Sequence, residues 1–181
     1  GPRFAATRHN IGFRVVDALV ERHGVTPAPF AEGWRGRLPD GLWIAKPGLF
    51  MNRSGVATSG LLAVLALEPA HMLVVVDDVD LPLGTIRLRP SGGPGTHNGL
   101  RDVVDNLGPG FPRLRVGVRG ADPWDDLAAY VLSDFPPDEA DLVEATLARA
   151  ADAVECAVAE GLAVAMNRFN RRPDPPQTAT D

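Results

Sequence analysis

The chain has 181 residues, of which 45% are hydrophobic, which is enough apolar material for one domain with a substantial core. Its formal net charge of -5 argues against a protein that binds nucleic acid over its whole surface, and its apolar runs are too short for a membrane-spanning helix. The single cysteine, Cys156, cannot form an intramolecular disulfide, so a reducing compartment and a cytoplasmic location are expected.

The first elements in the chain are a helix and a hairpin. Asn10 is a candidate N-cap, and apolar residues at helical spacing follow it as far as Gly24, which predicts a helix that begins directly after His9. Two short strand-like runs, residues 34–38 and 42–45, flank a Pro-Asp-Gly turn. They predict a β-hairpin.

A helix and a buried strand come next. Ser54 is expected to cap a helix that stops before Pro69. Residues 72–76 are continuously apolar, as in a strand with helices on both sheet faces. Asp77 follows at once, so its carboxylate is expected at the carboxyl end of this strand, where α/β proteins usually bind ligands.

The second half continues the alternation of strands and helices. An alternating strand pattern around residues 86–89 leads into a glycine-rich loop, and an amphipathic helix over residues 100–107 follows. A further strand over residues 114–118 and a long helix over residues 138–160 complete the series. The alternation predicts an α/β layered fold. We expect one domain over residues 1–170 and a disordered tail over residues 171–181.

Charge is distributed unevenly along the chain. Residues 82–119 hold six arginines against two aspartates, a local charge of +4, whereas residues 120–160 hold eleven acidic residues against one arginine. Four of the arginines alternate along the two predicted strands and are expected on their outer faces: Arg87, Arg89, Arg113 and Arg115. They form either an ordinary solvated face or a phosphate-binding surface, since arginine engages phosphate oxygens with paired donors.

Polar residues that could carry chemistry occur before the first helix, after the buried strand and after the glycine-rich loop. Hydrolysis of an ester needs a base, a group that orients the base, and donors for the developing oxyanion. His9, Asp77 and the amide of Asn98 are candidates for these roles. The segment Phe50-Met51-Asn52 is a fourth candidate.

Other kinds of site have weaker support. The aspartates at 77, 78 and 80 could bind Mg²⁺, although carboxylates after a strand are more often solvated turn residues. Asn98 occupies the place of the last glycine of a dinucleotide-binding loop. Neither Ser54 nor Ser59 lies in the Gly-x-Ser-x-Gly pattern of a nucleophilic serine.

Taken together, four motifs in this order resemble the bacterial peptidyl-tRNA hydrolase family. The motifs are Thr7-Arg8-His9-Asn10, Phe50-Met51-Asn52, Asp77-Asp78-x-Asp80-Leu81-Pro82 and His97-Asn98-Gly99-Leu100-Arg101. The resemblance implies a compact, monomeric α/β enzyme with a mixed sheet, which we expect to be mostly parallel and flanked by helices. It also implies peptidyl-tRNA as the substrate and no required metal or organic cofactor.

The resemblance assigns roles to the motif residues. It implies that His9 is the base that acts on the attacking water, and that Asp77 orients this histidine. Asn52 and Asn98 are then the amides that position the substrate or water and stabilise the carbonyl oxygen, with Phe50 and Met51 as further substrate contacts. The four arginines of the basic stretch are expected to bind tRNA phosphates.

Two other functions stay open. A non-catalytic RNA-binding relative would keep the fold without turnover, and a general peptide or ester hydrolase would act on simpler substrates. Members of the resembling family usually begin with an apolar strand leading into Gly-Leu-Gly-Asn-Pro-Gly, whereas this chain opens at what resembles the final glycine, Gly1. We therefore expect the functional protein to extend upstream by roughly ten residues that supply a central strand.

Overall fold

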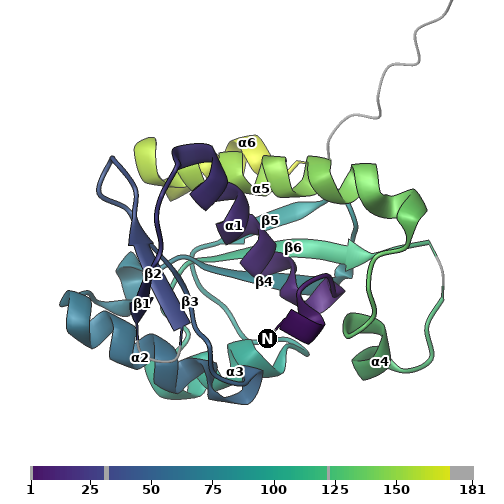
Figure 1. The fold of residues 1–181 in the computed structure, drawn as a ribbon, viewed down its shortest axis with the longest axis horizontal. Coiled ribbons are helices and arrows are strands. Elements are labelled where there is room, and N and C mark those ends of the chain that lie inside the picture. Colours follow the sequence, from purple (N-terminus) through teal and green to yellow (C-terminus); the bar gives the residue numbers. More distant parts are fainter. Residues whose placement is uncertain (1, 31–32, 122, 172–181) are drawn as a thin grey trace, which may run out of the picture.

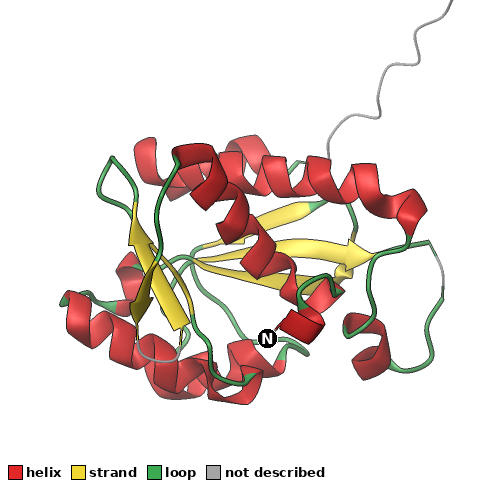
Figure 2. Cartoon of the chain, viewed as in Figure 1, coloured by secondary structure: helices red, strands yellow, loops and turns green. Residues whose placement is uncertain are grey.

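The computed structural model describes residues 2–30, 33–121 and 123–171. Its helices and strands, in chain order, are α1 (Ile11–His23), β1 (Ala28–Phe30), β2 (Gly33–Arg37), β3 (Trp43–Lys46), α2 (Ser54–Leu65), β4 (Val74–Pro82), β5 (Ile86–Arg89), α3 (Asn98–Leu107), β6 (Arg113–Arg119), α4 (Leu127–Val131), α5 (Ala140–Ala159) and α6 (Leu162–Phe169). Figure 2 shows helices on both sides of the central strands. The predicted α/β class is confirmed.

The central sheet has the strand order β4-β6-β5. β4 and β6 are parallel, and α3 lies in the connection between them, as a parallel pair requires. β5 is antiparallel to β6. It follows β4 after a short turn at Gly84, whose φ of 88° is costly for other residues. The sheet is therefore mixed, as predicted, but it is not mostly parallel, because so short a connection can only reverse the chain.

β4 is longer than the sequence predicts. The apolar run over residues 72–76 suggested that the strand ends before the aspartates, but β4 continues to Pro82 and contains Asp77 and Asp78. Both aspartates are only 5% exposed. The prediction that these carboxylates follow the strand is wrong, because partners from distant parts of the chain allow charged side chains to be buried within it.

The helices form layers on the two faces of the central sheet, as Figure 1 shows. α1, α5 and α6 pack on one face, where Ile11 and Val143 join Leu114 and Val116 of β6 in the larger core. α3 covers part of the other face through Leu100 and Val103, and α2 packs against α3. The continuous apolar run at the start of β4 is explained by this coverage on both faces.

A second, antiparallel sheet of order β1-β2-β3 lies beside α1. β2 and β3 form the hairpin that the sequence predicts, with Arg35 opposite Ala45. β1 was not predicted because it is short and contains Pro29, which cannot donate a ladder hydrogen bond. Proline is accepted here because β1 is an edge strand.

The polar residues at two helix starts do not cap their helices. The side chain of Asn10 makes no capping hydrogen bond and instead donates from Nδ2 to the carbonyl of Phe4 at 2.5 Å. Ser54 is the first residue of α2, and its hydroxyl donates to the carbonyl of Met51 at 2.8 Å. Both side chains therefore bind the backbone of the preceding segment. Asn10 occupies the predicted N-cap position of α1 without a capping hydrogen bond, whereas the prediction that Ser54 caps α2 is wrong because Arg53 holds that position.

The structure leaves the predicted tail, the domain limits and the upstream strand untested. No helix in the described part of the chain is long and apolar enough to cross a membrane. The predicted tail spans residues 171–181, of which 172–181 lie outside the described residues, and the domain limits stay a prediction. The upstream strand also stays a prediction.

A cavity of about 730 Å³, lined mainly by apolar side chains, lies between β4, α1, α2 and β3.

Candidate active site

His9 and Asp77 are brought together from positions 68 residues apart in the chain. His9 lies in the short 3-10 helix η2 (Arg8–Asn10), directly before α1, and Asp77 lies in β4. His9 Nδ1 is 2.8 Å from Asp77 Oδ1, and the two side chains are 18% and 5% exposed. A proton on Nδ1 satisfies the carboxylate and leaves the lone pair of Nε2 available as a base.

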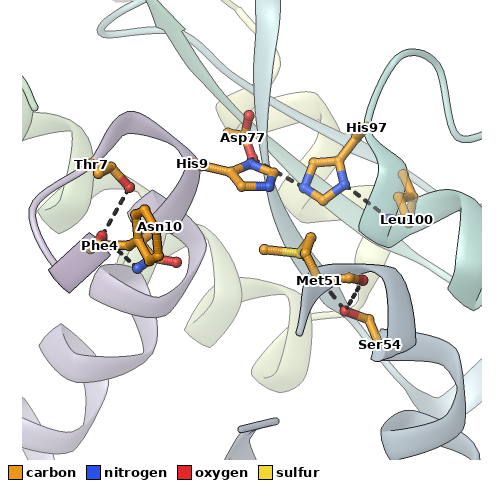
Figure 3. A network of polar contacts seen from close by, with 9 residues as sticks. All are labelled: Phe4, Thr7, His9, Asn10, Met51, Ser54, Asp77, His97 and Leu100. Carbon is orange, nitrogen blue, oxygen red and sulfur yellow. Dashed lines mark hydrogen bonds and ion pairs between the residues drawn. The ribbon is translucent and has the colours of Figure 1, made fainter. Parts of the chain in front are cut away.

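A second histidine, His97, completes a cluster around the same carboxylate oxygen (Figure 3). Its Nε2 is 3.0 Å from Asp77 Oδ1, and its ring centre is 4.9 Å from that of His9. Its Nδ1 accepts a hydrogen bond of 2.9 Å from the backbone N–H of Leu100 in the first turn of α3. Because Nδ1 is an acceptor, the proton of the neutral ring must be on Nε2, facing Asp77.

The two histidines decide the charge of Asp77. Burial by itself would raise the pKa of this carboxyl group, but hydrogen bonds from His9 and His97 outweigh burial and hold the pKa below its ordinary value of 3.8. Asp77 is therefore an ionised carboxylate that accepts two N–H donors on one oxygen. A negative charge at this place favours the imidazolium that forms when His9 takes up a proton.

Asp78 forms a separate pair with an arginine. Its Oδ2 is 3.0 Å from Arg115 Nε, and its Oδ1 accepts the backbone N–H of Asp80 at 2.9 Å. Burial nevertheless raises the pKa of Asp78 above its ordinary value, against the opposing effect of Asp80 N–H and Arg115. Asp80 itself is exposed. Since Asp77 and Asp78 are held by different partners, the three aspartates do not form the magnesium site considered from the sequence.

These groups face a cavity of about 440 Å³. One side carries His9, Asp77 and Asp78, and another carries Thr96, His97 and Asn98. The rest of the lining consists of Val79, Arg115, Asp126, three residues of α4 (Leu127, Ala128 and Val131) and Leu132. No serine or cysteine is among the described residues that line it. The cavity thus offers a base beside a space for water and substrate but no serine or cysteine nucleophile.

The predicted substrate contacts occupy different places around this cavity. Asn98 lines it and is exposed. Met51, in η3 (Met51–Arg53), packs so closely on Gly99 that a Cβ there would clash with its sulfur. Asn52 is exposed and is not among the residues that line the cavity, and the neighbouring Phe50 is 82% exposed. The structure therefore places Asn98 in the same cavity as His9 and leaves Asn52 and Phe50 on the surface.

The four arginines of the basic stretch share one face of the central sheet. Arg87 lies opposite Arg115, and Arg89 lies opposite Arg113. Arg89 is exposed, whereas Arg87 and Arg115 are half-buried. This cross-strand arrangement concentrates positive charge on the antiparallel pair β5 and β6.

Arg113 differs from the other three because it is only 1% exposed. Its guanidinium donates to the carbonyls of Gly92, Pro109 and Phe111, and burial lowers its pKa. The expectation that Arg113 belongs to an outward basic face is wrong. It instead fixes the start of the glycine-rich loop that leads to His97.

His9, Asp77 and His97 are also the described residues that could hold a metal ion, since their ligand atoms lie within 4.8 Å of one another. Two histidines and a carboxylate are common ligands of zinc and iron. A metal on His97 Nε2 would, however, require a proton on Nδ1, where the N–H of Leu100 already donates. The hydrogen-bonding pattern therefore favours shared protons over a metal at this cluster.

Sequence reasoning did not assign a role to His97 or to the residues around α4. His97 stands next to Asn98 in the quoted motif, which was the only local signal for it. Asp126 accepts the N–H groups of Ala128 and Ala129 and so caps α4, a common pattern that does not indicate a cavity wall.

Comparison with known proteins identifies the relatives of this arrangement. A family model described as peptidyl-tRNA hydrolase matches residues 1–177. A peptidyl-tRNA hydrolase of Chloroflexus aggregans is 48% identical over 179 residues, covering 94% of each chain. One from Synechococcus sp. (strain JA-3-3Ab) is 46% identical over 177 residues, covering 94% of this chain and 78% of the relative.

Solved structures agree with these relatives. The crystal structure of peptidyl-tRNA hydrolase from Acinetobacter baumannii has a TM-score of 0.86 and 33% sequence identity, covering 95% of this chain and 90% of that one. A crystal structure of a peptidyl-tRNA hydrolase with N-propanol has a TM-score of 0.87 and 32% identity, covering 97% and 92%.

Proposed function

Since the chain belongs to the peptidyl-tRNA hydrolase family, we propose that His9, oriented by Asp77, is the general base with which it cleaves peptidyl-tRNA. The reaction is hydrolysis of the ester bond between peptide and tRNA, which releases the tRNA for reuse in translation. The observation that carries the proposed mechanism is the 2.8 Å contact between His9 Nδ1 and Asp77 Oδ1 at the wall of the cavity.

The proposed reaction begins with a water molecule between His9 and the ester. His9 Nε2 takes a proton from this water as the oxygen attacks the ester carbonyl carbon. The imidazolium that forms is stabilised by the ionised Asp77, which the second donor, His97, helps to keep deprotonated. When the tetrahedral intermediate collapses, His9 returns the proton to the leaving 3′-terminal oxygen of the tRNA.

The negative charge on the carbonyl oxygen needs a donor that does not titrate. The amide of Asn98 suits this role because it lines the cavity that holds His9 and can donate two hydrogen bonds. Asn52 is the proposed second amide; it is exposed and does not line the cavity, so it contacts the part of the substrate that lies outside it. Its neighbours Met51 and Phe50 provide apolar contacts, and the exposed Phe50 ring is available to a base or a peptide side chain.

Arg87, Arg89 and Arg115 provide the tRNA phosphate site in this proposal. Arg115 lines the cavity, and the row continues along β5 towards the exposed Arg89. Arginine donors at this spacing can follow a phosphate backbone away from the ester. Arg113 is not included, because its donors are occupied within the fold.

The two rival functions have less support. A binding protein without catalysis has no need for a buried carboxylate held by two histidines, which is costly to maintain. A general ester hydrolase would usually carry a nucleophile or a metal. The described lining of the cavity holds neither serine nor cysteine. The tautomer of neutral His97, with its proton on Nε2, disfavours a metal at that nitrogen. We further propose that the enzyme acts as a monomer in the cytoplasm without a cofactor.

Hydrolysis in H₂¹⁸O tests the proposed chemistry. With N-acetylated aminoacyl-tRNA as substrate and enzyme in excess, direct attack by water at the carbonyl carbon places one ¹⁸O in the released carboxylate and none in the 3′-hydroxyl of the tRNA. Label in the tRNA would show that water attacks the ribose carbon, and a covalent acyl-enzyme detected by mass spectrometry would show a protein nucleophile. Either result would contradict direct attack by water at the carbonyl carbon. A simple ester hydrolysed as efficiently as the tRNA substrate would favour the general hydrolase.

A further inference from the structure

We propose that Arg8 is a positioning residue for the reaction: it holds His9 and the α4 wall of the cavity in a fixed relation without touching the substrate. The proposal rests on the proposed role of His9 as the base. Arg8 directly precedes His9 in η2, yet it is not among the residues that line the cavity. Any effect of Arg8 on turnover must therefore pass through its neighbours.

The burial of Arg8 is the first observation. Its side chain is 6% exposed, although an arginine at a surface helix start would ordinarily extend into water. Burying a guanidinium is costly unless its donors and charge are matched. A buried arginine beside the base therefore requires specific partners.

Those partners come from β6 and from the part of the chain that runs from α4 to the start of α5. Arg8 Nη1 donates to the carbonyl of Val118 in β6 at 2.9 Å, and Nη2 is 2.9 Å from Oε2 of Glu139, directly before α5. The guanidinium carbon lies 4.6 Å from the ring centres of both Tyr130 and Phe135. A planar cation that donates at its edge and contacts aromatic rings uses properties that lysine does not share.

Tyr130 connects this cation to the cavity wall. It belongs to α4, whose residues Leu127, Ala128 and Val131 line the cavity. Its hydroxyl accepts the N–H of Gly120 at 2.8 Å and donates to the carbonyl of Val118 at 3.1 Å, the same carbonyl that Arg8 binds. The carbonyl of Val118 in β6 thus binds both Arg8, which is next to the base, and Tyr130 of α4, the helix that lines the cavity.

The backbone strengthens the connection. The N–H of Arg8 donates to the carbonyl of Ser133 at 3.0 Å, and Thr7 forms an isolated β-bridge with Asp134. Main-chain and side-chain contacts therefore join η2 to the segment after α4. His9, in the same short helix, contacts Asp77. Catalytic groups need placement within about 0.5 Å, and a shift of about 1 Å can cost 10²-fold in rate.

The test separates positioning from stability by removing the whole ion pair. Arg8→Met alone leaves the half-buried Glu139 without its cation. The double variant Arg8→Met/Glu139→Met is therefore measured as well, because replacing both charges often restores stability. We expect the double variant to recover most of the melting temperature but to lose about tenfold or more in kcat, with KM within about twofold of wild type.

Arg8→Lys provides a second variant that keeps the charge. A lysine cannot bind Val118 and Glu139 while contacting both rings, so we expect a folded protein with reduced kcat and unchanged KM. Arg14→Met is the matched control, because Arg14 also pairs with a glutamate, Glu144, and lies over Phe135 at 5.8 Å. It should keep wild-type kcat.

His9→Ala is measured in the same assay to separate the two proposals. If His9→Ala abolishes turnover while Arg8→Lys and the double variant keep wild-type kcat, the positioning role of Arg8 is wrong and the proposed function stands. If His9→Ala keeps turnover, the proposed function itself is wrong. A loss of kcat in both Arg8 variants at temperatures well below their melting points, with KM unchanged, supports the positioning role.

Discussion

Replacing Asp77 with asparagine removes the charge at the centre of the site while keeping the shape of the side chain. Asp77 Oδ1 accepts hydrogen bonds of 2.8 and 3.0 Å from the two histidines, and an amide oxygen can accept the same bonds. The Asp77→Asn variant therefore tests the charge of the carboxylate more than its position. The loss should appear when His9 becomes cationic, which occurs in the transition state.

The size of the effect follows from the geometry. A carboxylate and an imidazolium about 4 Å apart attract each other by about 4 kcal/mol at an effective dielectric constant of about 20, an upper limit for this pair. Hydrogen bonds to charged groups contribute about 1.5–3 kcal/mol net. At about 1.4 kcal/mol for each factor of ten, we expect kcat to fall about 10- to 150-fold. KM should change little, because the Asp77 contacts are with the histidines.

The assay is steady-state hydrolysis of N-acetylated aminoacyl-tRNA, with circular dichroism to confirm the fold. Asp80→Asn is the control, since Asp80 is an exposed carboxylate three residues further along β4. If a folded Asp77→Asn enzyme kept kcat within about twofold of wild type, the charge of Asp77 would have no role in the rate, and the electrostatic argument would fail.

Three further predictions concern stability and tRNA binding. The pKa of Asp77 is held below 3.8 in the folded protein, so its ionisation contributes stability that is fully present above pH 3.8 and is lost as the pH falls through the folded pKa. The free energies of unfolding of wild type and Asp77→Asn, measured with urea, should therefore converge in this acid range. A difference that stays constant with pH would contradict this prediction. Arg89→Gln should raise KM and lower the slope of log KM against log salt by about one, with the melting temperature unchanged. A wild-type slope would show that Arg89 is an ordinary surface charge and does not contact phosphate. Arg113→Met should lower the free energy of unfolding by about 2–4 kcal/mol, because the carbonyls of Gly92, Pro109 and Phe111 lose their donor; a wild-type stability would show that these bonds contribute nothing.

Local patterns in the sequence were sufficient for most elements of the fold. The helices over Ile11–His23 and Ala140–Ala159 and the hairpin of β2 and β3 were predicted from periodicity and turn residues, which act over a few positions. The direction of β5 and the true end of β4 could not be predicted in this way. They depend on the pairing of both strands with β6, which is more than 20 residues away in the chain.

The sequence motifs identified the base and its carboxylate, but the contacts that depend on tertiary structure were missed. His9 and Asp77 were identified from the motifs, but the sharing of Asp77 by His97 depends on the tautomer that the Leu100 N–H imposes. The alternating pattern placed Arg113 on an outer face, whereas the loop after β5 covers it. Periodicity gives the face of a strand, but it does not say which faces later segments bury.

The central claim, that His9 is the base, is tested most directly by single-turnover hydrolysis of N-acetylated aminoacyl-tRNA with His9→Ala. The control is His23→Ala, which removes a histidine that pairs with Glu155 on the surface between α1 and α5. We expect His9→Ala to fold normally, to bind the substrate, and to lose about 10²-fold or more in the rate of ester cleavage, while His23→Ala keeps the wild-type rate. A folded His9→Ala enzyme that cleaves the ester at the wild-type rate would contradict the claim.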